Sequence, residues 1–265
     1  MTRKTDSETF PTPALAPPPL PAPSARWALF LDVDGTLLEL APTPAAVRVD
    51  PELIELLSRL HEALQGALAL ISGRALPDID RLFAPLRLNA AGQHGLERRG
   101  ADGNSVRITA DAVLTAEIRR RARALAAAHP GVLLEDKGGC LALHYRARPE
   151  LAAALADACC AVVAASAGLY ELQPGHCVYE LKPAGADKGQ AVEAFLAEAP
   201  FAGRLPVMVG DDLTDEHAFA SVNRLGGISV RVGTRSPSAA CHVLPQPAAV
   251  HHWLAQVLDR LTRPT

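Results

Sequence analysis

Short, continuous apolar runs alternate with amphipathic helical patterns along most of this chain. The first predicted strand spans residues 27–31, and a helix follows that Asp50 and Pro51 open. Strands that are apolar on every residue are buried on both faces, which is typical of parallel sheets connected by helices. The sequence therefore predicts an α/β fold with a Rossmann-like parallel-sheet core.

The same alternation places the remaining core elements. Helices are expected near residues 76–83, 190–198, 215–222 and 250–261, and strands at 68–71, 88–91, 206–209 and 228–232. The middle of the chain has a different pattern, with helices over 112–128 and 149–165 and strand pairs around Gly138-Gly139 and Gly175. Hairpins that alternate with helices predict an inserted α+β cap domain, an antiparallel sheet with helices on one side.

These patterns divide the chain into a tail, a core in two parts and a cap. Hinges are expected near residues 100–104 and 183–185. The tail contains seven prolines and is predicted to be disordered. The four segments are residues 1–25, 26–103, 104–182 and 183–265.

Composition excludes some classes of partner. The net charge of −3 is spread along the chain, without the basic face that nucleic acid requires or the polybasic cluster that attracts anionic membranes. No apolar run approaches the roughly 20 residues of a membrane span, and residues 1–25 lack a secretion signal. The five cysteines form no Cys-x-x-Cys pair. We expect reduced thiols and a cytoplasmic location.

Two acidic residues directly follow the first strand. Asp32 and Asp34 lie in Asp-Val-Asp-Gly-Thr, at the strand end where open parallel sheets bind ligands. Asp-Gly after a strand is also a common turn signal, so Asp34-Gly35-Thr36 alone is weak evidence. Two crowded carboxylates are unfavourable unless a cation compensates them, so the pair indicates a site that handles phosphate or metal.

Two further segments offer groups that bind anions. Ser72-Gly73-Arg74 follows the strand at 68–71 and provides a hydroxyl and close backbone approach, although Ser-Gly is also ordinary loop sequence. Lys188 opens a helix that Asp187 can cap, which places an ammonium beside free N–H groups. A surface lysine is the plain alternative. Both segments are candidates for phosphate binding.

An acidic segment follows the strand at 206–209. Asp215 and Glu216 suit the positive end of a helix dipole. Asp211 and Asp212 lie at the strand end and are better explained as metal ligands or supports. Because the ligands are hard oxygens without a His or Cys cluster, the segment favours Mg²⁺.

Together these segments resemble the four ordered motifs of the haloacid dehalogenase superfamily, from residue 27 to the end of the chain. The resemblance implies that Asp32 is a nucleophile forming an aspartyl phosphate and that Asp34 acts first as acid and then as base. It assigns Mg²⁺ to Asp32, the backbone carbonyl of Asp34 and Asp211, with Asp212 or Asp215 in support. The implied phosphate-binding residues are Thr36, Ser72, Gly73 and Lys188.

A narrower resemblance is to trehalose-6-phosphate phosphatases. It is carried by Leu-Ile-Ser72-Gly-Arg74, Ala-Gly-Gln-His94-Gly, His144-Tyr-Arg146, Glu180-Leu-Lys182-Pro and Gly-Asp211-Asp212-Leu-Thr-Asp215-Glu216. It implies hydrolysis of trehalose 6-phosphate to trehalose and phosphate, the last step of trehalose biosynthesis. The sugar-binding residues that it implies in the cap are Glu135, Lys137, Glu180 and Lys182.

Several alternatives remain open at this stage. Alternating Glu and Lys on strand faces are also typical of solvated surfaces, and for Lys182 the two interpretations are equal. Most histidines are interpreted as surface or packing residues, and His94 and His144 receive no role. Other substrates are sucrose phosphate, mannosylglycerate phosphate or a monosaccharide phosphate, and other functions are a phosphomutase or a catalytically silent sugar-phosphate sensor. The sequence leaves the oligomeric state open.

Overall fold

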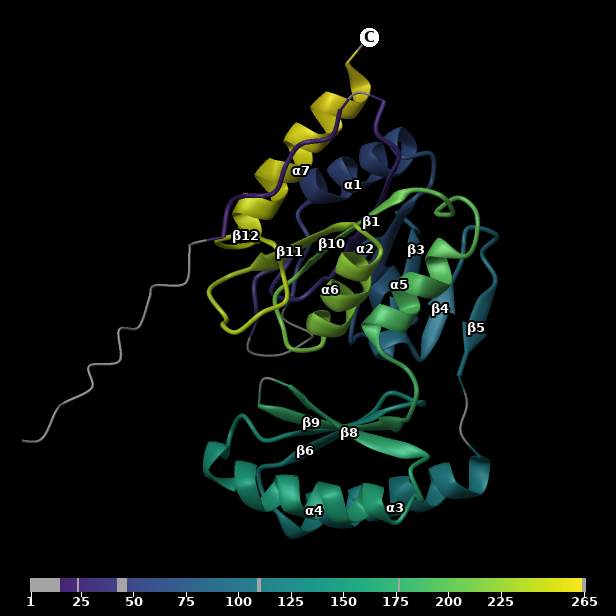
Figure 1. The fold of residues 1–265 in the computed structure, drawn as a ribbon. Coiled ribbons are helices and arrows are strands. Elements are labelled where there is room, and N and C mark those ends of the chain that lie inside the picture. The colour runs from purple at the N-terminus through teal and green to yellow at the C-terminus, as the bar shows by residue number, and fades with distance from the viewer. Residues whose placement is uncertain (1–14, 23, 42–46, 109–110, 176, 264–265) are drawn as a thin grey trace, which may run out of the picture.

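The computed structural model describes residues 15–22, 24–41, 47–108, 111–175 and 177–263. Its core is an eight-stranded sheet in the order β12-β11-β10-β1-β2-β3-β4-β5, and the cap is a separate four-stranded sheet (Figure 1). The core strands are β1 (Trp27–Leu31), β2 (Leu68–Ile71), β3 (Asn89–Gly92), β4 (Glu97–Arg99), β5 (Ser105–Arg107), β10 (Leu205–Gly210), β11 (Ile228–Val232) and β12 (His242–Leu244).

The central strand β1 pairs in parallel with β10 on one side and β2 on the other. All five of its residues are buried, because helices cover both faces of the sheet. Helices α1 and α7 contact each other on one face, and α5 and α6 contact each other on the other (Figure 1). The core helices are α1 (Pro51–Ala63), α2 (Leu76–Phe83), α5 (Lys188–Leu196), α6 (Asp215–Arg224) and α7 (Pro247–Thr262).

The predicted parallel core is confirmed, but three strands lie beyond it. β12 adds a further parallel strand, and β4 and β5 extend the sheet beyond β3 in antiparallel pairing. The pattern Glu97-Arg98-Arg99 has no apolar run, so it gives no strand signal. Ion pairs stabilise β4 instead: Arg99 binds Asp80 at 2.6 Å, and Glu97 binds Arg107 at 2.6 Å.

The cap has the predicted α+β architecture. Its antiparallel sheet has the order β6-β7-β9-β8, with α3 and α4 on one face and the core on the other side (Figure 1). Asp111 caps α3 by accepting a hydrogen bond from the backbone N–H of Leu114. The cap elements are α3 (Ala112–Ala128), β6 (Leu133–Asp136), β7 (Leu141–His144), η3 (Pro149–Leu151), α4 (Ala152–Ala164), β8 (Tyr170–Gly175) and β9 (Val178–Pro183).

The first boundary of the cap differs from the expectation. Because β5 pairs with β4, residues 105–107 belong to the core sheet and the cap begins at α3. The expected hinge at 100–104 is a closed turn of that sheet, in which Gly100 donates its N–H to the carbonyl of Asn104. The first connection between core and cap therefore lies between β5 and α3.

The tail also differs in part from the expectation. Residues 1–14 lie outside the described part, but residues 15–22 run along α7 (Figure 1). Trp253 of α7 donates its indole N–H to the carbonyl of Pro19 at 3.2 Å, and Val243 donates to the carbonyl of Ala16. The prediction of disorder is therefore wrong for residues 15–22, because prolines that cannot pair in a sheet still pack through carbonyls and rings. Across the described residues, no helix combines the length and apolarity needed to cross a membrane.

Candidate active site

Asp32 lies at the carboxyl end of β1, the central strand of the core. Its backbone N–H donates to the carbonyl of Val209 on β10, which fixes the residue beside the end of the neighbouring strand. Its side chain is buried, and Oδ1 accepts a hydrogen bond from Nζ of Lys188 at 2.7 Å. Both the backbone and the side chain of Asp32 are therefore held in place by hydrogen bonds.

Lys188 comes from the opening residue of α5. Asp187 caps this helix by accepting from the backbone N–H of Gln190 at 2.8 Å, which confirms the expected helix start. Nζ of Lys188 also donates to Oδ1 of Asp215 at 2.7 Å. Burial lowers the pKa of Lys188, but the carboxylates of Asp215 and Asp32 outweigh it and raise that pKa above its ordinary value. The lysine is therefore a fixed cation at the strand ends.

Three carboxylates converge around this cation. Asp32, Asp211 and Asp215 each offer an oxygen within 4.8 Å of the others. Burial, opposed by Lys188 and reinforced by the neighbouring carboxylates, raises the pKa of Asp32 well above its usual range. Burial and Asp215 raise the pKa of Asp211 to about 6. Three hard oxygen donors whose negative charge is only partly compensated fit a divalent cation.

Residues of the first loop pack directly against this cluster. Gly35 has a φ of +81°, and a Cβ atom there would lie 2.2 Å from Oδ2 of Asp211, so only glycine fits. The hydroxyl of the buried Thr36 donates to Oδ1 of Asp211 at 3.2 Å. Thr36, predicted to bind phosphate, therefore orients a carboxylate of the cluster in this structure.

Asp212 and Asp215 have different environments. Oδ2 of the fully buried Asp215 accepts from the backbone N–H groups of Asp211 and Asp212, both at 3.0 Å, so it shapes the loop between β10 and α6. Oδ1 of Asp212 instead binds Arg235 at 3.0 Å. Of the two residues expected to support the metal, Asp215 therefore lies in the three-carboxylate cluster, whereas the carboxylate of Asp212 turns to a surface arginine.

Asp34 is held by a residue to which the sequence analysis gave no role. Nε and one terminal nitrogen of Arg74 each donate to an oxygen of Asp34 at 2.6 Å. Arg74 belongs to the loop after β2, where its backbone N–H donates to Oγ of the buried Ser72 at 3.1 Å. The carboxylate of Asp34 is thus tied to the Ser72–Arg74 loop and lies outside the three-carboxylate cluster.

Two of the four predicted cap residues meet the core near this loop. Nζ of Lys137 donates to Oε1 of Glu180 at 2.6 Å and to the carbonyl of Gly73 at 3.1 Å. Oε2 of Glu180 contacts Nε2 of His94 at 2.6 Å. Burial raises the pKa of Glu180, but His94 and Lys137 outweigh it and hold the pKa below its ordinary range. The carboxylate is therefore kept charged between domains.

The other two predicted cap residues have separate partners. Oε2 of Glu135 contacts Nε2 of His144 at 2.9 Å, on the cap face that looks toward the core. The side chain of Lys182 is 1% exposed, and its ammonium binds the carbonyl of Ala186 and the carboxylate of Glu171. In this structure Lys182 is therefore a buried, paired cation beside the second connection, and its role in sugar binding stays a prediction.

Arg74, His94 and His144 are residues at this site for which sequence reasoning gave no role. All three lie within segments that carry the family resemblance, and this is the signal that the sequence offers. The pattern of a single chain does not show that the Arg74 guanidinium faces Asp34, or that the His94 imidazole crosses to the cap.

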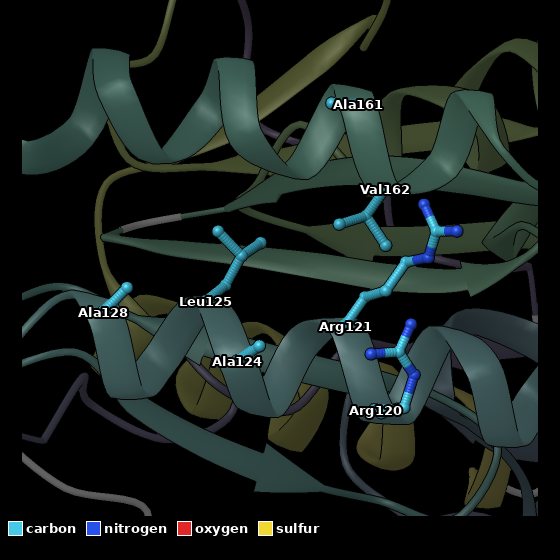
Figure 2. A pocket seen from close by; sticks show the side chains of 7 residues that line it. All are labelled: Arg120, Arg121, Ala124, Leu125, Ala128, Ala161 and Val162. Atoms are coloured by element: carbon cyan, nitrogen blue, oxygen red, sulfur yellow. The ribbon is translucent and has the colours of Figure 1, made fainter.

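Two surface hollows lie away from these residues. Figure 2 shows a groove of about 390 Å³ between α3 and α4, in the helical layer on the far side of the cap sheet from the core. Its two arginines, Arg120 and Arg121, both pair with Glu117. A pocket of about 430 Å³ lies at the amino ends of β2 and β3, the opposite edge of the sheet from Asp32. Neither hollow contains a group of the site.

Comparison of the sequence with known proteins finds one family model and several relatives that match most of this chain. A family model described as trehalose-phosphatase matches residues 30–245. A probable trehalose-phosphate phosphatase of Sinorhizobium fredii is 44% identical over 231 residues, which are 87% of each chain. The trehalose-6-phosphate phosphatase of Escherichia coli is 42% identical over 241 residues, 91% of this chain and 90% of that protein.

Structural comparison agrees on the fold. The C-terminal domain of a C. albicans trehalose-6-phosphate phosphatase superposes with a TM-score of 0.77 at 23% identity, covering 89% of this chain and 93% of that domain. The likeness extends to haloacid dehalogenase-type hydrolases, which confirms the predicted fold class.

Proposed function

The chain belongs to the trehalose-phosphatase family, and from that premise we propose that it hydrolyses trehalose 6-phosphate to trehalose and phosphate on Asp32. One observation carries the assignment of Asp32: it is the buried carboxylate at the end of the central strand that is fixed by Lys188 and flanked by Asp211 and Asp215. A binding protein has no need of such crowded acids.

In the first step, Oδ2 of Asp32 attacks the phosphorus atom, since Lys188 holds Oδ1. A P–O bond forms to Asp32 while the bond from phosphorus to the sugar oxygen breaks. Asp34, protonated, gives its proton to that oxygen as trehalose leaves. Arg74, which donates to both oxygens of Asp34, sets the orientation in which this carboxyl faces the leaving group.

In the second step, water attacks the aspartyl phosphate. Asp34, now a carboxylate, takes a proton from the water, a P–O bond forms to the water oxygen, and the bond between phosphorus and Asp32 breaks. Inorganic phosphate and the original Asp32 carboxylate result. In this proposal, Lys188 and the loop at Ser72 and Gly73 bind the phosphoryl oxygens in both steps.

Mg²⁺ is the cation that best suits this donor set. Asp32 and Asp211 would hold it, with Asp215 behind them, and a bound Mg²⁺ would offset the negative charge of the phosphoryl group. The charge balance supports this: the three carboxylates face one ammonium among the described residues, so one further cation compensates both the acids and the phosphate.

Recognition of the sugar is proposed for the polar face of the cap. Glu135, Lys137 and Glu180 offer two carboxylates and an ammonium, and sugar hydroxyls can donate to and accept from such groups. Lys137 already contacts Gly73, so the sugar site adjoins the phosphate loop. A disaccharide phosphate therefore bridges cap and core.

A substrate panel tests the function. Phosphate release is measured with trehalose 6-phosphate, sucrose 6-phosphate and glucose 6-phosphate under identical conditions with Mg²⁺. We expect kcat/KM for trehalose 6-phosphate to exceed the other two at least tenfold. Equal rates on all three would refute the substrate assignment, and isomerised sugar phosphate without free phosphate would indicate a mutase.

A further inference from the structure

His94 joins the core to the cap at the centre of the proposed sugar site. It lies in η2 (Gln93–Gly95), directly after β3, and its Nε2 contacts Oε2 of Glu180 on β9 at 2.6 Å. Its side chain is 11% exposed and that of Glu180 is 6% exposed. The contact is therefore a buried imidazole–carboxylate contact that joins the core to the cap.

The backbone that carries His94 is strained. Gln93 and His94 have φ values of +50° and +58°, in the left-handed region that costs residues other than glycine roughly 1–2 kcal/mol each. Two hydrogen bonds hold this conformation: Gln93 N–H donates to the carbonyl of Arg74 and His94 N–H to that of Ser72. Strain of this kind, held in place by surrounding contacts, points to a functional position.

The imidazole of His94 also lies directly over the phosphate loop. A Cβ atom on Gly73 would lie 2.7 Å from both Cε1 and Nε2 of His94, so the ring occupies the space that a side chain at position 73 would fill. The His94 ring therefore requires glycine at position 73, in addition to any close approach of the backbone to phosphate. His94 is thus fixed to Ser72 through its backbone and to Gly73 through its ring, and its neighbour Gln93 is bonded to Arg74.

Glu180 is oriented from two sides by groups attached to that loop. His94 holds one oxygen, and Lys137, which also contacts the Gly73 carbonyl, holds the other. An ionised carboxylate has about four acceptor sites, so two remain for sugar hydroxyls. Because both neighbours are tied to Gly73, the distance between these acceptors and the phosphate site is fixed.

We propose that His94 is a positioning residue for substrate selection, which fixes Glu180 at a set distance from the phosphate loop so that a disaccharide hydroxyl meets it. The inference rests on the proposed function and goes beyond it in assigning part of sugar recognition to the core. Across the described residues, Nδ1 of His94 has no partner, so the ring acts on its surroundings by hydrogen bonding through Glu180.

The test compares a sugar phosphate with p-nitrophenyl phosphate, which has no sugar hydroxyls. In His94→Ala, we expect the ratio of kcat/KM on trehalose 6-phosphate to that on p-nitrophenyl phosphate to fall at least tenfold, mainly through KM. His94→Gln, whose amide can donate at the position of Nε2, should recover most of that ratio. His129→Ala is the matched control, because its ring binds only the Leu125 carbonyl at the end of α3 among the described residues.

A double-mutant cycle adds a second readout. If His94 acts through Glu180, then His94→Ala combined with Glu180→Gln should lower the ratio no further than either single change. Additive losses would overturn the inference, as would equal losses on both substrates, which a merely structural role predicts. The substrate panel on the wild-type protein alone decides the proposed function. The His94 variants are then assayed on whichever sugar phosphate the wild type prefers. A wrong substrate assignment and a wrong role for His94 therefore give different results.

Discussion

Arg74 and Asp34 form a two-point contact in which each carboxylate oxygen accepts a hydrogen bond of 2.6 Å from the guanidinium. Fork-shaped pairs of this type fix both the position and the plane of a carboxylate. The side chain of Asp34 is 32% exposed while that of Arg74 is 11% exposed, so the acid faces the substrate space and the arginine lies behind it. Arg74 therefore prepares the proposed acid without being placed to touch phosphorus.

Replacing Arg74 by Ala should lower kcat on trehalose 6-phosphate about 10- to 100-fold, because a well-placed general acid contributes about 10²–10⁴ and Arg74 supplies part of that placement. p-Nitrophenyl phosphate should lose less, since its leaving group departs as a stable anion. Arg74→Lys keeps the charge but not the fork and should fall between. Steady-state kinetics on both substrates decides, and equal losses would mean that Arg74 does not act through Asp34.

Asp32→Asn should abolish turnover, with a loss on the order of 10⁴-fold or more in phosphate release. The amide lacks the charge needed for attack, yet Lys188 retains Asp215 as a partner. Removing one of three crowded carboxylates should leave the midpoint of thermal unfolding unchanged or higher without metal. Hydroxylamine trapping should yield a modified Asp32 in the wild type alone, detectable by mass spectrometry. A trapped product at another residue would refute the nucleophile.

Mg²⁺ should raise the thermal stability of the protein, by about 2.7 kcal/mol at a concentration 100-fold above its Kd. Asp211→Asn should lose this increase, because Asp211 belongs to the three-carboxylate cluster. Asp212→Asn is a matched control one residue away, whose carboxylate binds Arg235 instead. Calorimetric scans with Mg²⁺ and with a chelator compare the three proteins. An equal loss in both variants would contradict the assignment of the cluster.

The thiols should differ sharply in reactivity. Burial raises the pKa of Cys159 to about 11, and its neighbour Cys160 is exposed. Because the thiolate is the reactive form, iodoacetamide at pH 8 should label Cys160 and leave Cys159 unmodified until the protein unfolds. Tandem mass spectrometry separates the two positions. Rapid labelling of Cys159 in the folded protein would show that α4 does not pack against the cap sheet as described.

Sequence patterns were sufficient where burial of apolar side chains decides the structure. The strand over 27–31 and the helix over 112–128 appear with the expected bounds, because continuous apolar runs and helical periodicity report burial directly. β4 and β5 could not be found in this way. Glu97-Arg98-Arg99 is polar, and its stability comes from ion pairs with residues that are distant in sequence.

The same limit applies within the site. Asp32, Lys188, Asp211 and Asp215 come together because each follows a strand or opens a helix at one edge of the sheet, which their places in the chain already imply. The directions of Asp212 and Lys182 depend on which neighbour lies within reach. The carboxylate of Asp212 turns to Arg235, and the ammonium of Lys182 binds Ala186 and Glu171. No local sequence pattern predicts these contacts.

Gly35 offers a test of how tightly the first loop is built against the cluster. With a φ of +81° and only 2.2 Å from a would-be Cβ to Oδ2 of Asp211, Gly35→Ala combines backbone strain with displacement of a carboxylate. We expect activity to fall more than 100-fold and the stability increase with Mg²⁺ to disappear. Gly103→Ala is the matched control, because its φ is +77° but nothing lies within 4 Å of its Cβ position.

That control should cost only the backbone strain, roughly 1–2 kcal/mol of unfolding free energy, and should keep both activity and the Mg²⁺ effect. Denaturant unfolding and phosphate release measured on both variants separate the two causes. If Gly35→Ala lost stability to the same extent as Gly103→Ala and stayed active, Asp211 would have room to move, and the close fit between the first loop and the cluster would not be needed for catalysis.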